Sequence, residues 1–379
     1  MDVTVVDHID AIPAAQWNAL AGVDNPFLRH ELISAFERTG CAVPKTGWRP
    51  QHLAIYDDAH LVGAAPIYLK SHTYGEFVFD FAWAEAYRRA GLRYYPKLIS
   101  AIPFSPVSGR RLLAADHPRR EQIAHRLIEA AIALAHRTGA SSMHWLFPDA
   151  DDMRVLEDRG MLRRDGFQYH WLNPGYRDFD DFLSTFNAQK RKKVRRERRH
   201  VAEAGVTIEV LEGRAITATH WDLMHDFHQA TIQQYGAPPF LTRAFFHALA
   251  ESMPDNAMLV LARHGREYVG GALNLVGGEA LYGRYWGGRP GYNSLHFEVC
   301  YYSAIEYCIA KGLKRFEGGA GGEHKLARGF VPVPTCSAHW LKHPQFARAV
   351  ADFLARERNG IELYLDELNE HTPFKKAAG

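Results

Sequence analysis

The sequence predicts an α/β protein with two similar units in tandem, each a mixed β-sheet covered by helices on both faces. The length of 379 residues allows two or three ordinary domains. Apolar residues make up 47% of the chain and charged residues 23%, a balance typical of globular proteins with substantial cores. Strand patterns alternate with helical patterns along the chain, and one of these patterns occurs twice.

The repeated pattern is a β-hairpin. His52–Leu69 aligns without a gap with Leu259–Val276, 207 residues later, and both segments run from an apolar strand through a polar turn into a second strand. Each hairpin follows a helical pattern that begins with Pro-Phe-Leu, at 26–28 and at 239–241. Each is followed by a helix, a glycine and a strand: 120–137, Gly139 and 142–147 in the first half, and 296–310, Gly312 and 314–317 in the second.

Each half is expected to end on a strand with a His-Trp pair, at 170–171 and at 339–340. Both halves then run helix, β-hairpin, helix, strand, helix, strand. The turn cluster Asn173-Pro174-Gly175 predicts the boundary between them. We therefore expect a first domain over 1–174, a second over 175–344, and a segment over 345–379 whose helix, 345–368, packs on the second half.

The first half alone carries a long insertion, 79–109, which is rich in aromatic residues and prolines. It is too apolar for a solvated linker, and loops of this length in compact domains are usually functional or contain elements of their own. We expect the insertion to form a wall of a substrate cleft. A structural clasp between the two halves is the alternative.

The net charge of +2 hides a local concentration of positive charge. Residues 190–199 hold eight Lys or Arg and one Glu, whereas the rest of the chain holds 37 basic and 42 acidic residues, a net charge of −5. One helix is predicted over 180–204, with Val194 and Val201 in a thin apolar seam. Like charges four residues apart cost about 0.2–0.5 kcal/mol per pair, which favours an anionic partner over a solvated helix. Nucleic acid is one such partner, and a phosphorylated acceptor or a membrane lipid is another. The candidate nucleic-acid contacts are Lys190, Arg191, Lys192, Lys193, Arg195, Arg196 and Arg199.

Several protein classes are disfavoured by what the sequence lacks. No segment approaches 18 consecutive apolar residues, and the first ten residues do not have the pattern of a signal peptide. The four cysteines show no CxxC spacing, which fits a reducing cytoplasm. There is no GxxxxGK[ST] loop, no HExxH and no Cys/His cluster. We expect a cytoplasmic protein without a transmembrane segment and without a bound metal.

One group of candidate site residues lies between 284 and 298, where a predicted strand turns through glycines into a helix. A reaction that joins an amine to a carbonyl carbon needs a base for the ammonium and donors for the tetrahedral oxyanion. Glu298, in the first helical turn, is a candidate base, although it can equally complement the helix dipole. Arg284 and Tyr285 would support the oxyanion, and Arg289 and His296 would contact substrate.

A second group lies in the charged segment GEHKLARGF, residues 322–330, just beyond a predicted strand. Ligands of open α/β sheets bind beyond the carboxyl ends of strands. Glu323 or His324 is a candidate general base or acid, and Lys325 and Arg328 are candidates for binding phosphate. The alternative is a solvated loop with four charged groups.

The chain resembles a known family in four motifs that occur in the same order. These are YYPKL (94–98), PFSPVSGRRLL (103–113), HFEVCYY (296–302) and GEHKLARGF (322–330). The motifs resemble those of N-acyltransferases labelled peptidoglycan biosynthesis/recognition proteins, over roughly residues 25–343. That family is similar to the FemAB aminoacyltransferases and has the acyl-CoA N-acyltransferase (GNAT) fold in tandem. The resemblance implies transfer of an acyl group onto an amine without a prosthetic group. It places Glu298 and 323–328 at motif positions, and Tyr95, Lys97 and Ser105 of the first two motifs are candidates for substrate binding.

The identity of the acyl donor stays open between two classes. The GNAT loop for the CoA pyrophosphate has the form Q/R-x-x-G-x-G/A, and residues 289–294 depart from it because Pro290 has no N–H. With the basic helix, this departure slightly favours aminoacyl-tRNA over acyl-CoA, which stays possible as a co-substrate. The alternatives are an acyl-CoA-dependent N-acetyltransferase of a small molecule and a non-catalytic binder of tRNA or a cell-wall precursor. The sequence predicts neither the amine acceptor nor the oligomeric state.

Overall fold

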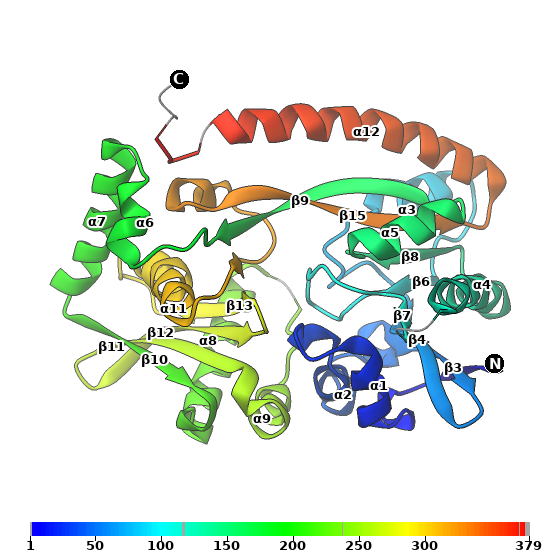
Figure 1. The fold of residues 1–379 in the computed structure, drawn as a ribbon, viewed down its shortest axis with the longest axis horizontal. Helices are drawn as coiled ribbons and strands as arrows, with labels where there is room; N and C mark the ends of the chain where they lie inside the picture. Colours follow the sequence, from blue (N-terminus) through cyan, green and yellow to red (C-terminus); the bar gives the residue numbers. More distant parts are fainter. Residues whose placement is uncertain (1, 116–117, 237, 371, 376–379) are drawn as a thin grey trace. The chain divides into compact units, whose positions relative to one another are not determined.

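The computed structural model describes residues 2–115, 118–236, 238–370 and 372–375. The chain forms two compact units, one of Met1–Phe167 and Pro334–Leu363, the other of Gln168–Val333 and Tyr364–Gly379. The chain passes between the units within two long strands, β9 (Leu162–Leu172) and β15 (Val331–Leu341), and within the last helix, α12 (Pro344–Glu370) (Figure 1). The boundaries expected from the sequence, at 174 and 344, lie just beyond the first two of these passages.

The second unit is built on a mixed sheet. Four of its strands follow one another in an antiparallel series, which Figure 1 shows side by side. A short parallel strand then lies beside the fourth, and the end of β9 pairs antiparallel with it. The series is β10 (Val206–Glu212), β11 (Ala257–His264), β12 (Glu267–Val276) and β13 (Ala280–Gly288), and the parallel strand is β14 (Arg315–Glu317).

Helices cover both faces of this sheet, as the sequence predicts. Neighbouring residues on a strand point to opposite faces, and Gly270 and Gly271 lie next to each other on β12. A Cβ on Gly271 would meet Met224 of α8, whereas a Cβ on Gly270 would meet Leu295 of α10 on the other face. The helices are α8 (Ala218–Gln234) and α9 (Arg243–Ser252), and then α10 (Leu295–Phe297), which continues through the π-helical turn Glu298–Tyr302 into α11 (Ser303–Lys311).

The predicted basic helix 180–204 is not one helix. The structure has α6 (Phe179–Ser184) and α7 (Ala188–Glu203) in its place. The break comes at Asn187, whose side chain accepts a hydrogen bond from the backbone N–H of Lys190 at 3.0 Å. Asparagine is among the best N-cap residues, so a new helix begins here.

The first unit contains two sheets, and its strands pair as in the second unit where the sequence repeats. The first sheet has the order β1 (Asp2–Val6), β3 (His52–Asp57), β4 (His60–Ala65), β7 (Leu113–Ala114). The second contains β2 (Trp48–Pro50), β5 (Ile67–Lys70), β6 (Lys97–Ser100) and β8 (Ser142–Leu146), with the end of β15 beside β8. The helices are α1 (Ala14–Ala21), α2 (His30–Arg38), α3 (Phe81–Arg89), α4 (Arg120–Thr138) and α5 (Ala150–Asp158).

The internal repeat is confirmed by a shared irregularity. The β3–β4 hairpin shifts register between Ile55 and Tyr56, and the β11–β12 hairpin shifts between Ala262 and Arg263, at the equivalent positions of the alignment. The repeat differs at Pro66, which separates β4 from β5, whereas β12 continues unbroken. Proline has no N–H for a strand ladder, which accounts for the break.

The final strands of the two sequence halves pair in a way that the repeat does not reveal. Trp171 of β9 lies opposite Phe316 of β14, in the second unit. His339 of β15 lies opposite His144 of β8, in the first unit. Each unit therefore receives its last strand from the other half of the sequence.

The first half of α12 packs in the first unit, and not on the second half as expected. Its Val350 and Leu354 are buried in one cluster with Trp83 and Tyr87 of α3. The periodic apolar positions of the helix were visible in the sequence, but the surface that covers them was not.

A close approach of α8 to β13 generates a first prediction. A Cβ on Gly287 would lie 1.9 Å from the carbonyl oxygen of Phe227, a backbone atom that cannot swing aside. We expect Gly287→Ala to destabilise the protein by about 1–3 kcal/mol or more, measured by urea unfolding. Gly360→Ala is the matched control, because Gly360 is helical with open space around its Cα, and it should cost nothing. Equal unfolding midpoints for the two variants would contradict the packing described.

Candidate active site

The candidate site of the second unit forms where β13 and β14 diverge. The two strands pair only over Ala280–Tyr282 and Arg315–Glu317. The register between β12 and β13 shifts directly after this paired stretch. Arg284 is therefore an extra residue between Gly283 and Tyr285, which both pair with β12. Bulges of this kind re-aim a side chain, and they are common next to active sites. Beyond β14 the chain enters the glycine-rich loop 318–322.

Arg284 and Glu317 form a buried ion pair at this divergence. Their side chains are each 3% exposed, and a guanidinium nitrogen of Arg284 lies 3.6 Å from Oε2 of Glu317. Burial lowers the pKa of Arg284 and raises that of Glu317, whose pKa the neighbouring Arg284 and Arg315 lower in turn. Two charges kept out of water in one place are costly, and such groups concentrate at functional sites.

Lys325 is the second buried cation of the group. It lies in the 3₁₀ turn Glu323–Arg328, is 3% exposed, and donates hydrogen bonds to the carbonyls of Gly319 at 2.8 Å and Gly321 at 2.6 Å. Burial, and then the charge of Arg284, lower its pKa to about 7. Its amine is therefore divided between the charged and the neutral form near neutral pH.

Three further predicted residues surround this turn. His324 is exposed, and its Nε2 shares a hydrogen bond of 2.9 Å with the hydroxyl of Tyr301. The ring of His296 lies 5.8 Å from that of His324, and burial lowers the pKa of His296 to about 4, so that its imidazole is neutral at pH 7. Glu323 is exposed and accepts a hydrogen bond from the hydroxyl of Tyr364 at 2.5 Å.

Arg328 is held from the side of α7. It is 3% exposed, donates to Glu197 at 2.8 Å and to the carbonyl of His324 at 2.6 Å, and stacks over the ring of Phe297 at 3.3 Å. Glu197 also accepts a hydrogen bond from the hydroxyl of Tyr302. Arg328 thereby ties the charged segment to α7, while its buried Nε has no hydrogen-bond partner among the described residues.

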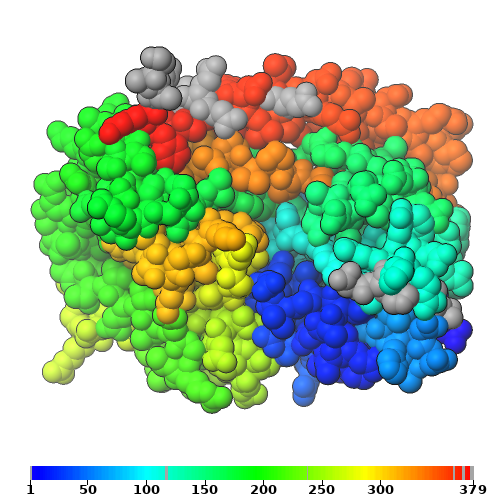
Figure 2. Space-filling view, in the orientation of Figure 1, coloured from blue at the N-terminus to red at the C-terminus, as the bar shows by residue number. Residues whose placement is uncertain are grey.

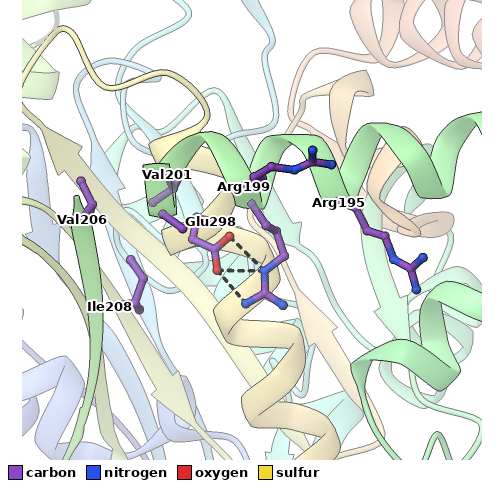
Figure 3. A pocket seen from close by; sticks show the side chains of 8 residues that line it. Arg195, Arg199, Val201, Val206, Ile208 and Glu298 are labelled. Atoms are coloured by element: carbon purple, nitrogen blue, oxygen red, sulfur yellow. Dashed lines mark hydrogen bonds and ion pairs between the residues drawn. The ribbon is translucent and has the colours of Figure 1, made fainter. Parts of the chain in front are cut away.

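Glu298 is also held by α7. Its carboxylate receives bonds from two nitrogens of Arg198, at distances down to 2.9 Å, and Arg198 binds Glu306 in the same bidentate way. Glu298 is 4% exposed, and burial raises its pKa while Arg198 lowers it. Figure 3 shows the carboxylate between β10, with Val206 and Ile208, and α7. These residues line a cavity of about 390 Å³. The π-helical turn that begins at Glu298 is a form often found at functional sites.

Glu197 and Arg198 were missed as site residues by reasoning from the sequence. They lie with Val194 and Val201 at the spacing i, i+3, i+4, i+7, which is one face of a helix. The signal was present, because the one acidic residue of the basic stripe falls on the apolar seam. The meaning of this signal depends on which residues pack against the apolar seam of α7, and the sequence does not give these.

The predicted nucleic-acid residues also lie on α7, and two of them, Arg195 and Arg199, line the 390 Å³ cavity together with Glu298. Lys192, Arg195, Arg196 and Arg199 are exposed, and Figure 2 shows α6 and α7, in green at the upper left, at the surface of the molecule. Arg195 is paired with Asp180 at 3.1 Å, and Arg191 donates to the carbonyl of Phe186 at 3.2 Å. A depression of about 360 Å³ is lined by Gln189, Lys190, Lys192, Lys193 and Arg196.

Two other predicted residues of the second unit lie in different surroundings. Tyr285 is 8% exposed, with its ring 5.1 Å from that of His228 on α8. Arg289 is exposed and pairs with Glu267 at 2.6 Å. Neither interaction joins these side chains to Lys325 or to Glu298.

The candidates of the first unit form a separate group. Lys97 is 1% exposed and pairs with Glu76 at 2.7 Å and with Asp80. Ser105 is 2% exposed and donates to the carbonyl of Pro103 at 3.0 Å, and Tyr95 is half-buried beside Tyr94. Lys97, which belongs to the predicted insertion 79–109, thus lies in a buried layer of charged side chains.

Two kinds of feature are absent from the described residues. No three or more His, Cys, Asp or Glu side chains in them gather as a metal site would require. None of the helices described is both long and apolar enough to pass through a bilayer.

Comparisons with known proteins agree on family and fold. A family model described as FemAB-like, peptidoglycan biosynthesis/recognition, matches residues 8–376. FemX is 11% identical, with 93% of this chain and 100% of FemX covered and a TM-score of 0.55. The C-terminal domain of a putative lysylphosphatidylglycerol synthetase from Agrobacterium fabrum is 10% identical, with 92% and 96% covered and a TM-score of 0.53. L-PGS from Bacillus licheniformis is 10% identical, with 88% and 97% covered and a TM-score of 0.51. No curated protein matches the sequence.

The family model covers nearly the whole chain, and the solved structures share the tandem α/β fold that the sequence motifs imply. The chain therefore belongs to the FemAB-like family and is an enzyme of the acyl- and aminoacyl-transferase class.

Proposed function

We propose that the protein moves an activated aminoacyl group from tRNA onto an amine, at the divergence of β13 and β14. The observation that carries this proposal is Lys325, a buried lysine whose pKa is lowered to about 7 beside the Arg284–Glu317 pair. A base poised near neutral pH is what the deprotonation of an ammonium nucleophile needs.

The hydrogen bonds of Lys325 suit it to this proton transfer. A neutral lysine amine has two N–H groups and one lone pair, and the carbonyls of Gly319 and Gly321 accept both hydrogens. The lone pair then takes a proton from the acceptor ammonium. The freed amine attacks the carbonyl carbon of the aminoacyl ester, and the C–O bond to the tRNA breaks. The attacking nitrogen gives its second surplus proton to the departing tRNA oxygen, and Lys325 releases the first proton to water, so the products are the amide, free tRNA and one proton.

Two neighbours complete the assignment. Arg284 is a buried cation 3.6 Å from Glu317, and a fixed positive charge in a site of low polarity stabilises a developing oxyanion. His324 is the exposed member of the group, and we assign it to contact with the incoming substrate. Glu298 has both carboxylate oxygens engaged by Arg198, so we assign it to the positioning of α7.

The preference for tRNA as donor rests on α7. Its inner face holds Glu298 and Arg328, while its outer face presents lysines and arginines around the 360 Å³ depression. A phosphate backbone bound there would release counterions and make the affinity strongly salt-dependent. Acyl-CoA is the alternative donor, and Pro290 in the corresponding loop argues against it.

Replacement of Lys325 tests the proposed base. The wild-type rate of transfer should rise with pH through about 7, because only the neutral amine accepts a proton. Lys325→Met should lose about a hundredfold or more in turnover and lose this rise. Transfer would be measured from charged total tRNA, and in parallel from acetyl-CoA, to a panel of amines.

Stability gives an independent control for this variant. The unfolded lysine keeps its proton up to about 10.5 while the folded one loses it near 7, so the free energy of unfolding should rise with pH between these values. Lys325→Met should remove this contribution. Glu298→Gln is the matched activity control, and its rate should keep the wild-type pH dependence. A flattened profile in Glu298→Gln but not in Lys325→Met would transfer the role of base to Glu298.

Replacement of the outer face of α7 tests the donor. Lys190, Lys192, Lys193 and Arg196 line the depression, and of these Lys193 also lies 4.0 Å from Glu197 of the inner face. Their joint exchange for Ala should weaken binding of tRNA and lower the slope of log affinity against log salt by about 0.7–0.9 for each phosphate that is no longer neutralised. Filter binding with a salt titration measures both quantities.

A control with the same change of charge is available in the first unit. Arg126, Arg137, Arg154 and Lys342 are exposed, and exchanging them for Ala should leave the salt slope as in wild type. Equal slopes for both quadruple variants would exclude α7 as the tRNA-binding surface. Turnover of acetyl-CoA by both variants at the wild-type rate, with no tRNA binding, would favour the CoA donor.

A further inference from the structure

One segment of the first unit has its polar and apolar side chains reversed relative to an ordinary surface loop. Between residues 73 and 81 the carboxylates of Glu76 and Asp80 are 3% and 4% exposed. The rings of Tyr74, Phe77, Phe79 and Phe81 are 52%, 38%, 58% and 54% exposed.

The buried carboxylates fix the segment from below. Glu76 and Asp80 both bind Lys97, and Asp80 also accepts a hydrogen bond from the hydroxyl of Tyr94 at 2.5 Å. Of these two partners, Lys97 belongs to β6 and Tyr94 lies just before this strand, and both are beneath the segment. Burying two carboxylates has a large desolvation cost. Here the two buried carboxylates hold a loop whose aromatic rings face outward.

The backbone of the segment is fixed as well. Lys70 donates to the carbonyl of Tyr74 at 3.1 Å, and Arg164 donates to the carbonyl of Phe79 at 2.7 Å. Phe77 has a φ of 62°, a conformation that bulky residues rarely adopt. The rings are therefore presented by a rigid, locally strained loop, and strain of this kind is typically kept where it serves a function.

Two of the exposed rings, Phe79 and Phe81, lie together at the start of α3. Phe79 and Phe81 are stacked, with ring centroids 5.7 Å apart and planes at 9°. Phe81 begins α3, and the helix continues to Arg88 and Arg89, which are 73% and 75% exposed. Exposed aromatic groups of this number mark an interaction surface in a soluble protein.

The charges at the far end of α3 and just after it indicate the kind of partner. Three exposed arginines, at 88, 89 and 93, accompany one acidic side chain, Glu85. Aromatic rings flanked by arginines are the composition of helices and loops that enter the interface of an anionic bilayer. Nucleic acid is less well matched, because the two best exposed rings stack on each other and so leave fewer ring faces for bases.

We propose that the aromatic loop 74–81, with the arginines of α3, docks the first unit on the surface of an anionic lipid bilayer. The rings enter the headgroup region and the arginines contact lipid phosphates. The protein then acts on or near a membrane, although no helix in the described residues could span it. This inference does not depend on the proposed donor or on Lys325.

Flotation of the full-length protein with lipid vesicles tests the proposal. Vesicles of phosphatidylcholine with about 30% phosphatidylglycerol should bind the wild type. The exchange of Phe79 and Phe81 for Ser should lower the partition coefficient about tenfold or more, since each ring loses its apolar burial. Tyr235→Ser removes an aromatic ring that is 81% exposed in the second unit, and this control should bind as wild type.

Further measurements separate the other possible occupants. Exchange of Arg89 and Arg93 for Gln should weaken binding only to the anionic vesicles. Thermal unfolding should match wild type for every variant, because the side chains replaced are exposed. The proposal is overturned if wild type does not bind anionic vesicles, or if the Phe79/Phe81 variant binds them unchanged. It is also overturned if that variant instead loses self-association in sedimentation or loses RNA binding.

Discussion

The ion pairs on the inner face of α7 are the interactions on which the rest of the second unit depends. Glu197 binds Arg328, and Arg198 binds Glu298, so one turn of α7 holds both the charged segment after β14 and the helix after β13. Removing one partner of a buried pair typically costs about 3–5 kcal/mol, because the other charge is left without compensation. The same helix can therefore carry repelling cations on its outer face. Its position is set by the inner face and does not require a favourable outer one.

The chemical site of the second unit forms where β13 and β14 diverge, and it depends on a general property of mixed sheets. Where two parallel strands separate, backbone groups lose their ladder partners, and here Lys325 donates to the carbonyls of Gly319 and Gly321 in the loop that follows. The lysine reaches them only by being buried, and burial is the main cause of its lowered pKa. Burial thus accounts both for the hydrogen bonds of Lys325 and for its lowered pKa. A lysine in solvent would satisfy neither the carbonyls nor the demand for a base near neutral pH.

The first unit handles buried charge differently. One face of its second sheet packs against α4 through apolar residues such as Leu98 and Met143. The other face carries Lys97 and, on neighbouring strands, His144 and His339, whose Nδ1 atoms are 2.7 Å apart. This polar face is covered by the segment that contains Glu76 and Asp80, so the charges are neutralised inside and the rings of that segment remain outside. The two units thus share similar hairpins but bury their charged side chains in different arrangements.

By itself, the sequence determined the α/β class, the tandem repeat and most helix and strand positions, because periods of 2 and 3.6 residues are local properties of a chain. It also found the two charged segments, since motifs such as GEHKLARGF are contiguous. It did not determine that β9 pairs with β14 and β15 with β8, because strand pairing depends on partners far away in sequence. For the same reason Glu197 and Arg198 were indistinguishable from a solvated stripe, and Lys325 from a phosphate-binding lysine. Only tertiary burial decides which cations lose their water, and that loss sets both their pKa and their partners.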